Sequence, residues 1–364
     1  MAMTGDFWRG KRVLVTGHTG FKGSWLSMWL SHRGARVIGY ALAPSTALSN
    51  FVLSRVDELV HSIEADVCDL DRLRECMAEY RPDTVFHLAA QSLVRKSYSD
   101  PVETFRTNVL GTVNVLEAVR QCPTAKAVII VTSDKCYANR EWLWGYREYE
   151  PMGGHDPYSS SKGCAELITA SYRSSYFQPA NYDQHGIGVA TARAGNVIGG
   201  GDWSPDRLVP DILNAHARAE ELVIRNPSAI RPWQFVLEPL HGYMTLAERL
   251  YSDGTGLSEA WNFGPSDDDA LSVEALVKRL AAQLKGGIQY RVVQDAAMHE
   301  ATMLKLDCSK AATRLGWRPR TTIADTVRLI ADWQNHFLSK SDMQAVSLGQ
   351  IQAFESLLQD RGRS

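Results

Sequence analysis

Residues 12–24 have the sequence Arg-Val-Leu-Val-Thr-Gly-His-Thr-Gly-Phe-Lys-Gly-Ser. The β-branched run, the three spaced glycines and the apolar stretch that follows predict a strand, a tight loop and a helix. Such a loop allows close backbone approach to a ligand, while the helix N-terminus presents unpaired N–H groups to a pyrophosphate. The spacing alone is a weak signal, but its place in the first strand–helix unit predicts a dinucleotide site rather than a purely structural turn. The predicted cofactor contacts here are Gly17, His18, Gly20, Phe21, Lys22 and Gly23.

Apolar strands and helices continue to alternate beyond this first unit. Strands are predicted at 35–42, 60–66, 84–89, 127–132 and 188–193, and helices at 70–80, 102–120 and 158–172. Near-continuous apolar strands separated by helices indicate a parallel sheet that is covered on both faces. We therefore predict an α/β fold with a doubly wound, Rossmann-type NAD-binding domain over residues 1–195.

The second part of the chain departs from this alternation. Residues 199–210 are rich in glycine and proline, and short strands mixed with helices follow. Helical periodicity is present at 271–284 and 323–338. We predict a smaller, mixed α/β substrate-binding lobe over residues 196–364, with part of 231–265 returning to the first domain. The stretch 345–358 is predicted to be an added amphipathic helix that serves in packing or in a dimer contact.

Composition excludes several classes of function. The formal net charge is -2 with no long basic block, which argues against a nucleic-acid partner. Six cysteines occur without any C-x-x-C pair, which argues against a disulfide framework and a zinc site, so no metal is expected. The N-terminus lacks the apolar stretch of a signal peptide, and no run of eighteen apolar residues occurs to cross a membrane. A cytoplasmic protein without membrane association is expected.

The end of the second strand bears on the choice of cofactor. Residues 39–43 contain neither an acid for a ribose 2′-hydroxyl nor an arginine for a 2′-phosphate. The lack of a basic residue favours NAD over NADP. Asp66, beside Val67 at the end of the next strand, is predicted either to contact the adenine edge or to cap the helix segment that begins at Asp69.

Small residues follow the fourth strand, where a parallel sheet binds its ligand. Leu88, Ala89 and Ala90 are predicted to let the cofactor lie against the sheet, whereas His87 is expected to be a satisfied core histidine. Asn108 in the following helix either bends that helix and binds a water near the reactive groups or is simply an exposed polar residue. These two alternatives stay open.

A tyrosine and a lysine four residues apart, Tyr158 and Lys162, share one helical face. The ammonium is expected to lower the pKa of the phenol, and about 4 kcal/mol brings that pKa from about 10 to near 7. Pro157 before the pair and a strand that ends in Thr132-Ser133-Asp134 make this spacing specific for a dehydrogenase base. An acid and the amine of Lys135 at that strand end indicate further proton transfers, and therefore elimination.

These motifs resemble the extended short-chain dehydrogenase/reductase superfamily and, within it, the nucleotide-sugar 4,6-dehydratases. The resemblance covers nearly the whole chain and is most specific to the CDP-glucose subfamily. In the dTDP-glucose relatives, glutamate follows the catalytic aspartate, whereas here the residue is Lys135. The segments that carry the resemblance are Thr16–Ser24, Thr132–Tyr137, Asn139–Trp142, Arg193–Trp203 and Leu306–Ala311.

The resemblance implies NAD as cofactor and a reaction in three stages on a bound CDP-glucose. Tyr158 takes the C4 hydroxyl proton as hydride leaves C4, a base removes the C5 proton while Asp134 protonates the departing C6 hydroxyl, and hydride returns to C6. Lys135 is either the C5 base, which requires a pKa about three units below its free value of roughly 10.4, or a charged group that stabilises the enolate. Thr132 is expected to donate a hydrogen bond to the C4 oxygen.

Further substrate contacts are implied beyond the reacting groups. Asn196 and Arg231 are expected at the pyrophosphate, Arg231 for its fork of donors, with a surface salt bridge as its alternative. The other predicted substrate contacts are Gln91, Ser133 and His299. Trp142, Trp144 and Tyr146 are predicted to form either a lid over the sugar or an aromatic patch at a subunit contact.

The expected protein is a homodimeric lyase for deoxysugar biosynthesis, such as that of the lipopolysaccharide O-antigen. The alternatives are a dehydratase of dTDP- or GDP-sugars, a nucleotide-sugar 4-epimerase and a non-catalytic dinucleotide-sensing protein. An epimerase needs neither Asp134 nor Lys135, and a sensor needs no base beside a nicotinamide.

Overall fold

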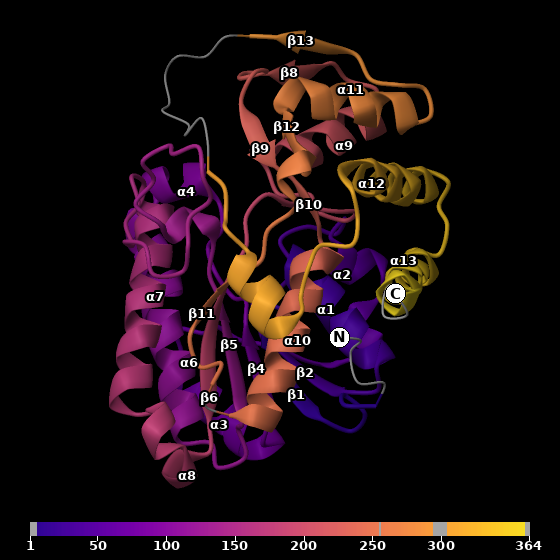
Figure 1. Cartoon of the computed structure of the whole chain (residues 1–364). Helices are drawn as coiled ribbons and strands as arrows, with labels where there is room; N and C mark the ends of the chain where they lie inside the picture. Colours follow the sequence, from indigo (N-terminus) through magenta and orange to yellow (C-terminus); the bar gives the residue numbers. More distant parts are fainter. Residues whose placement is uncertain (1–5, 255, 294–303, 361–364) are drawn as a thin grey trace.

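The computed structural model describes residues 6–254, 256–293 and 304–360. Its centre is a seven-stranded sheet with the order β11-β6-β5-β4-β1-β2-β3 (Figure 1). Every neighbouring pair in this sheet is parallel, which confirms the predicted doubly wound α/β fold. Its strands are β1 Arg12–Thr16, β2 Arg36–Ala41, β3 His61–Glu64, β4 Thr84–His87, β5 Ala127–Val131, β6 Gly188–Arg193 and β11 Ala260–Asn262.

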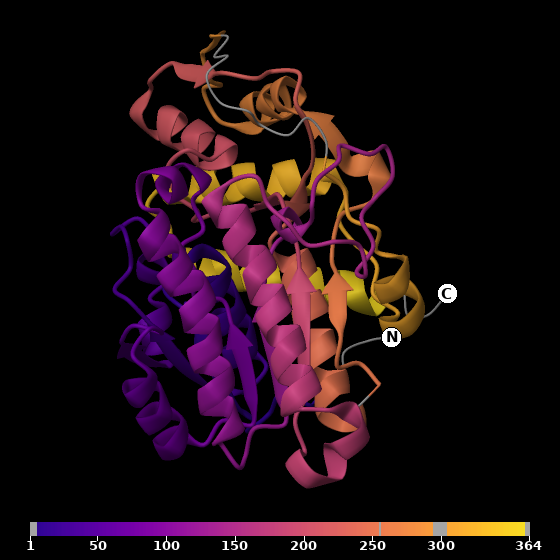
Figure 2. The same cartoon turned by 90° about the vertical axis from the view of Figure 1, so that its left-hand side faces the viewer.

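Helices cover both faces of this sheet because successive strand residues point to opposite sides. Val13 and Val15 of β1 pack in one buried cluster with α1 (Phe21–His32) and α10 (Leu237–Asp253). Leu14 packs in a second cluster on the other face, with α3 (Leu70–Tyr80), α6 (Gly111–Arg120) and α7 (Pro157–Ser175) (Figure 2). The strand ends therefore lie at one well-supported edge, between two helical layers.

The predicted helix 102–120 is interrupted in the structure. It consists of α5 (Pro101–Phe105), a turn of π-helix at Arg106–Leu110 and α6. A π-turn inserts an extra residue into the helical ladder and is frequent at functional sites. Asn108 lies in this turn and is buried, so its exposed alternative is wrong. Sequence periodicity does not reveal such an insertion.

A smaller lobe stands above the carboxyl ends of the sheet strands in Figure 1. It contains α9 (Leu208–Arg218), α11 (Val273–Gln283) and two strand pairs. The parallel pair is β8 (Leu222–Ile224) with β13 (Tyr290–Val292), and the antiparallel pair is β9 (Ile230–Pro232) with β12 (Ala270–Ser272). The predicted helix 271–284 thus begins late, because Ser272 is its N-cap and accepts from the Ala275 amide.

The chain returns from this lobe to the large sheet. Strand β10 (Gln234–Phe235) pairs with β7 (Val197–Ile198), α10 packs beside β5 and β6, and β11 adds a strand at the edge of β6. The remaining short helices are α2 Asn50–Leu53, α4 Val94–Ser99 and α8 Tyr182–His185.

The last two helices fasten the smaller lobe to the first domain. Helix α12 (Ile323–Leu338) begins with a capping box of Thr322 and Asp325, and α13 spans Met343–Asp360. Helix α13 packs on α1 and α2, where Glu355 accepts from the Trp29 indole N–H at 2.8 Å. The sequence predicts that this helix serves either in packing or in a dimer contact, and its contacts with α1 and α2 show packing. None of the helices in the described ranges is long and apolar enough to cross a membrane.

Candidate active site

The glycine loop after β1 forms a close-fitting backbone cradle. Gly17 has a φ of +75°, and a Cβ on it would lie 2.6 Å from the Ala89 amide nitrogen. A Cβ on Gly23 would lie 2.0 Å from the Gly17 carbonyl oxygen. The first residue before α1, Gly20, carries no side chain to cap the helix N-terminus, so the amides there stay available to an anion. This geometry fits the pyrophosphate of a dinucleotide.

Two further residues of the same loop have different environments. The His18 ring is buried, and its Nε2 lies 2.7 Å from the Ser62 hydroxyl. Burial lowers the pKa of His18 to about 4, so the ring is neutral at pH 7. Lys22 is half-buried, and burial, with help from the neighbouring charge of Lys162, lowers its pKa to about 7. Lys22 thus reaches toward the reactive groups and not only toward the phosphate loop.

The region predicted to meet the adenosine is held by local hydrogen bonds. One oxygen of Asp66 accepts from the Cys68 amide at 2.9 Å, and the other lies 3.5 Å from the Arg106 guanidinium. The helix cap is Asp69, which accepts from the Arg72 amide, so Asp66 does not cap α3. Val67 is buried beneath the segment.

Asn108 fastens the segment after β4 to the catalytic helix. Its amide donates to the Gln91 carbonyl at 2.9 Å and to the Ser161 hydroxyl at 2.8 Å, and its oxygen accepts from the Gln91 amide. The Gln91 side-chain amide donates to Thr104 and to the Leu93 carbonyl, so it stabilises the loop and does not point into an open pocket. Leu88, Ala89 and Ala90 are half-buried along this loop.

His87 is the buried core histidine that was expected. Its ring nitrogens lie 2.7 Å from the Thr16 hydroxyl and 3.3 Å from the Thr112 hydroxyl. Burial lowers its pKa to about 3, and the ring is therefore neutral.

Helix α7 delivers Tyr158 and Lys162 to the carboxyl end of β5. Its N-terminus is fixed by the Asp156 cap and by Pro157 in the first turn. Both side chains are buried, and the Lys162 ammonium donates to the Val131 carbonyl at 3.3 Å. Burial lowers the pKa of Lys162 to about 8.

The protein groups alone do not lower the pKa of Tyr158, contrary to the sequence-based expectation for Lys162. Burial raises this pKa, and it outweighs the lowering contributed by the neighbouring Ser133 hydroxyl and by the charge of Arg207. The hydroxyl that acts on the phenol is therefore that of Ser133.

Asp134 occupies a closely confined position beside these groups. It is buried, accepts from the Ser133 hydroxyl at 2.9 Å and lies 3.4 Å from the Asn196 amide nitrogen. A Cβ on Gly195 would lie 1.8 Å from an Asp134 carboxylate oxygen, so any larger residue there must displace the carboxylate. Asn196, with a φ of +50°, contacts the acid, and its predicted pyrophosphate contact remains a prediction.

The hydrogen-bond partner of Thr132 and the exposure of Lys135 differ from those that were predicted. The Thr132 hydroxyl donates to the buried carboxylate of Glu166, so its only hydrogen is not free for a C4 oxygen. The expectation that Thr132 donates to the substrate is thus wrong for this arrangement. The Lys135 side chain is exposed and is not enclosed by other protein groups.

The structure describes one of the two remaining residues that were predicted to contact the substrate. Arg231 lies half-buried in β9 and donates to the Ile230 carbonyl at 3.0 Å. His299 lies outside the described residues. Arg207 was missed, although its charge acts on the pKa of Tyr158. Its guanidinium donates to the carbonyl and the hydroxyl of Ser92 and lies 3.3 Å from Asp202.

The aromatic residues after the catalytic loop form a stack. The ring centroids of Tyr137 and Tyr146 lie 5.2 Å apart, and those of Tyr146 and Trp142 lie 5.4 Å apart. Trp144 contacts Trp142 and is 61% exposed. The buried half of this stack supports the loop, and the choice between lid and subunit contact stays a prediction for the exposed half.

No group of three or more histidine, cysteine or acidic side chains in the described ranges is arranged to hold a metal ion. The cysteines at 68, 76, 122, 136, 164 and 308 are all free thiols. The described site therefore consists of proton-transferring side chains next to a dinucleotide cradle.

Comparison with known proteins agrees with this geometry. The model of the GDP-mannose 4,6 dehydratase family matches residues 14–330. The CDP-glucose 4,6-dehydratase of Salmonella typhimurium is 53% identical over 351 residues, which cover 96% of this chain and 98% of that protein. The NAD complexes of a Brucella ovis UDP-glucose 4-epimerase and a Bacillus anthracis dTDP-glucose 4,6-dehydratase have TM-scores of 0.75 and 0.72. They are 23% and 20% identical and cover 90% and 92% of this chain and 99% and 100% of their own, so they show the fold alone.

Proposed function

The chain belongs to the GDP-mannose 4,6 dehydratase family, and on this premise we propose that it converts CDP-D-glucose to CDP-4-dehydro-6-deoxy-D-glucose with NAD. The observation that carries the choice of substrate is the 53% identity, over 96% of the chain, to a CDP-glucose 4,6-dehydratase. The acid and lysine at 134 and 135, beside Tyr158, support an elimination coupled to hydride transfer.

The first stage oxidises the sugar at C4. Tyr158 accepts the proton of the C4 hydroxyl, and the neighbouring Ser133 hydroxyl lowers the pKa of the phenol. When bound, NAD would supply the acceptor and later the donor of the hydride, and the positive charge of its oxidised form would favour the phenolate of Tyr158. Lys162, anchored on the Val131 carbonyl, keeps its ammonium on the same helical face.

The second stage eliminates water across C5 and C6. Buried Asp134 acts as the general acid and donates its proton to the departing C6 hydroxyl. Lys135 removes the C5 proton. Because its side chain is exposed in the protein alone, we infer that the bound sugar covers it.

The role of Lys135 is tested with Lys135→Met. C4 oxidation should remain measurable as formation of reduced nicotinamide, while exchange of the C5 hydrogen with solvent deuterium should be lost. Undiminished C5 exchange in this variant would refute the base role and leave the role of enolate stabiliser.

Substrate choice is tested by incubating the protein and NAD with CDP-, dTDP-, UDP- and GDP-glucose and by measuring loss of water by mass spectrometry. Loss from CDP-glucose alone is expected. Loss only from another nucleotide would refute the choice of substrate, and inversion at C4 without loss of water would favour an epimerase. A protein that binds NAD without changing any sugar would be a dinucleotide sensor.

We propose a homodimer because two packed helices expose large apolar side chains. Helices α5 and α7 are in contact; Val102 of α5 is 78% exposed and Leu167 of α7 is 61% exposed. Exposed apolar side chains on such a helix pair favour burial against a second copy. Val102→Glu should shift the protein to monomers in sedimentation velocity, whereas an unchanged mass would refute this surface. The free thiols fit a reducing cytoplasm, where such an enzyme supplies deoxysugars, for example to the lipopolysaccharide O-antigen.

A further inference from the structure

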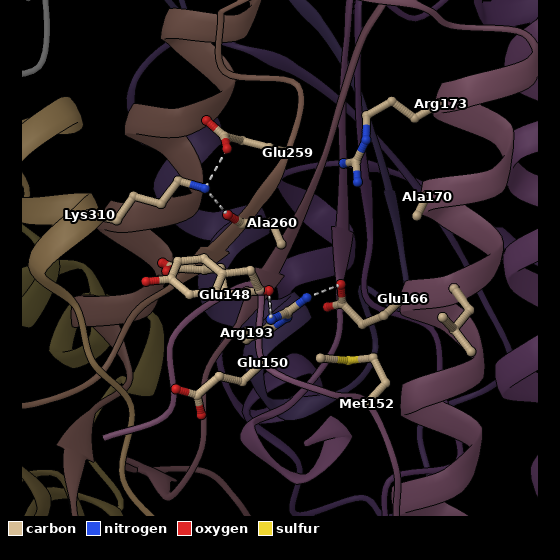
Figure 3. A pocket seen from close by; sticks show the side chains of 12 residues that line it. Glu148, Glu150, Met152, Glu166, Ala170, Arg173, Arg193, Glu259, Ala260 and Lys310 are labelled. Atoms are coloured by element: carbon tan, nitrogen blue, oxygen red, sulfur yellow. Dashed lines mark hydrogen bonds and ion pairs between the residues drawn. The ribbon is translucent and has the colours of Figure 1, made fainter. Parts of the chain in front are cut away.

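A buried ion pair lies directly behind the reactive groups. Glu166 follows Lys162 by one helical turn on α7, and its carboxylate lies 2.7 Å from the guanidinium of Arg193 at the end of β6. Each side chain is only 4% exposed. Figure 3 shows the two joined by this contact among the side chains that line a cavity of about 290 Å³. Because removing two charges from water is costly, such a pair is weak evidence for stability and calls for another explanation.

The pair is bonded to both ends of the segment that carries the acid and the lysine. Glu166 accepts from Thr132 at one end, and from Thr191 on the neighbouring strand at 2.7 Å. Arg193 donates to the Tyr137 hydroxyl at the other end at 2.6 Å. Between these two anchors lie only Ser133, Asp134, Lys135 and Cys136.

The second anchor is itself held from the opposite side. The Tyr137 hydroxyl donates to the Asn262 side-chain oxygen at 2.8 Å, and the Asn262 amide donates to the carbonyls of Tyr146 and Asp307. Arg193 also donates to the Glu148 carbonyl at 2.9 Å (Figure 3). The Arg193 guanidinium thus donates to a carboxylate, a phenol and a carbonyl at the same time. The ammonium of a lysine does not reproduce this planar set of donors.

We propose that Glu166 and Arg193 are positioning residues that clamp the segment 132–137, so that Asp134 and Lys135 meet C6 and C5 of the sugar in line. The clamp touches neither sugar nor cofactor and acts through Thr132 and Tyr137. Its chief effect falls on the elimination, because Asp134 and Lys135 lie between the two anchors, whereas the C4 base Tyr158 lies outside the segment on α7 and meets it only through Ser133. The inference rests on the proposed function and adds two residues to it.

The test compares the partial reactions in single turnovers with CDP-glucose and NAD. Glu166→Gln removes the negative charge that pairs with Arg193 and turns one of the two accepting oxygens into a donor, so the side chain no longer accepts from Thr132 and from Arg193 with separate oxygens. Reduced nicotinamide should form at a rate within about threefold of the wild-type rate and should disappear about a hundredfold more slowly, as expected for misplaced groups. KM should change little, since no substrate contact is removed.

Two matched pairs of variants separate positioning from mere stability. Thr132→Val removes the donor to Glu166 with the same shape and should repeat the effect, whereas Thr132→Ser keeps the hydroxyl and should restore the wild-type ratio of the two rates. Asp83→Asn breaks a partly buried ion pair with Arg12 at the other end of the strands and should leave that ratio unchanged.

The outcomes are distinct for the function and for the clamp. A wild-type protein that removes no water from CDP-glucose would refute both. If the wild type is active, an unchanged ratio in Glu166→Gln or, should that variant not fold, in Thr132→Val would refute the clamp alone. Additive effects in the double variant Glu166→Gln/Thr132→Val would also overturn it, because one clamp predicts that the second change adds little.

Discussion

Gly195 sets the position of the proposed acid, and replacing it with alanine gives a quantitative test. The added Cβ would lie 1.8 Å from an Asp134 carboxylate oxygen, whereas real contacts of this kind begin at about 3.0 Å, so the carboxylate must move by roughly 1 Å. A displacement of about 1 Å can cost about a hundredfold in rate, equivalent to about 3 kcal/mol of activation free energy.

The loss should appear in catalysis more than in stability. The atom that must give way is the far end of a side chain, so the backbone of Gly195 and its neighbours can stay in place. We expect kcat for water loss from CDP-glucose to fall about a hundredfold, while the melting temperature falls by only a few degrees. Formation of reduced nicotinamide should persist, because Tyr158 is not displaced.

Gly349→Ala in α13 is the matched control for Gly195→Ala. A Cβ at this position meets nothing within 4 Å, so activity should be unchanged. Turnover of Gly195→Ala at the wild-type rate, with the fold intact, would refute the claim that Asp134 acts as the acid from its observed position.

The other predictions address single contacts. Ser133→Ala removes the hydroxyl that lowers the pKa of Tyr158, so this pKa should rise and the acidic limb of the kcat/KM profile should move to higher pH; an unmoved limb would contradict this effect of Ser133. Burial raises the pKa of Glu238 from 4.5 to about 7, so the folded state loses stability as pH rises through about 7. Glu238→Gln should abolish this fall of up to about 3 kcal/mol in urea unfolding, and a fall that persists would exclude Glu238 as its source. Gly349→Ala should raise the free energy of unfolding by up to about 1 kcal/mol, and a destabilised variant would show that α13 tolerates no side chain there.

The sheet and the long helices were predictable because local patterns and tertiary structure agree. The strand Gly188–Arg193 and the helix Ile323–Leu338 have the bounds expected from their apolar periodicity. The prediction of a continuous helix 102–120 is wrong in one detail, because a π-turn interrupts it. In this turn Asn108 contacts Gln91 and Ser161, which are distant in the sequence. No propensity marks that insertion in advance.

The identity of the hydroxyl at the phenol could not be obtained from sequence. Thr132 and Ser133 are adjacent at a strand end, where successive side chains point to opposite sides. Thr132 therefore meets Glu166 and Ser133 meets the phenol, and an error of one residue in the predicted orientation would exchange the two roles. The exposure of Lys135 likewise depends on which distant segments cover it.

Glu166 itself had a usable signal that was overlooked. It lies four residues after Lys162 on the same helical face, where a buried acid needs a partner, and Arg193 ends a buried strand. By contrast, Arg207 lies in the segment rich in glycine and proline, where no local pattern predicts that its charge reaches Tyr158.

The fate of the C4 hydrogen tests the proposed reaction most directly. CDP-glucose labelled with deuterium at C4 is incubated with the protein and NAD, and the product is analysed by mass spectrometry and NMR. We predict a product that has lost one water and carries the deuterium at C6, because hydride leaves C4 and returns to C6 within one active site. A product without deuterium at C6, or no loss of water, would contradict the account.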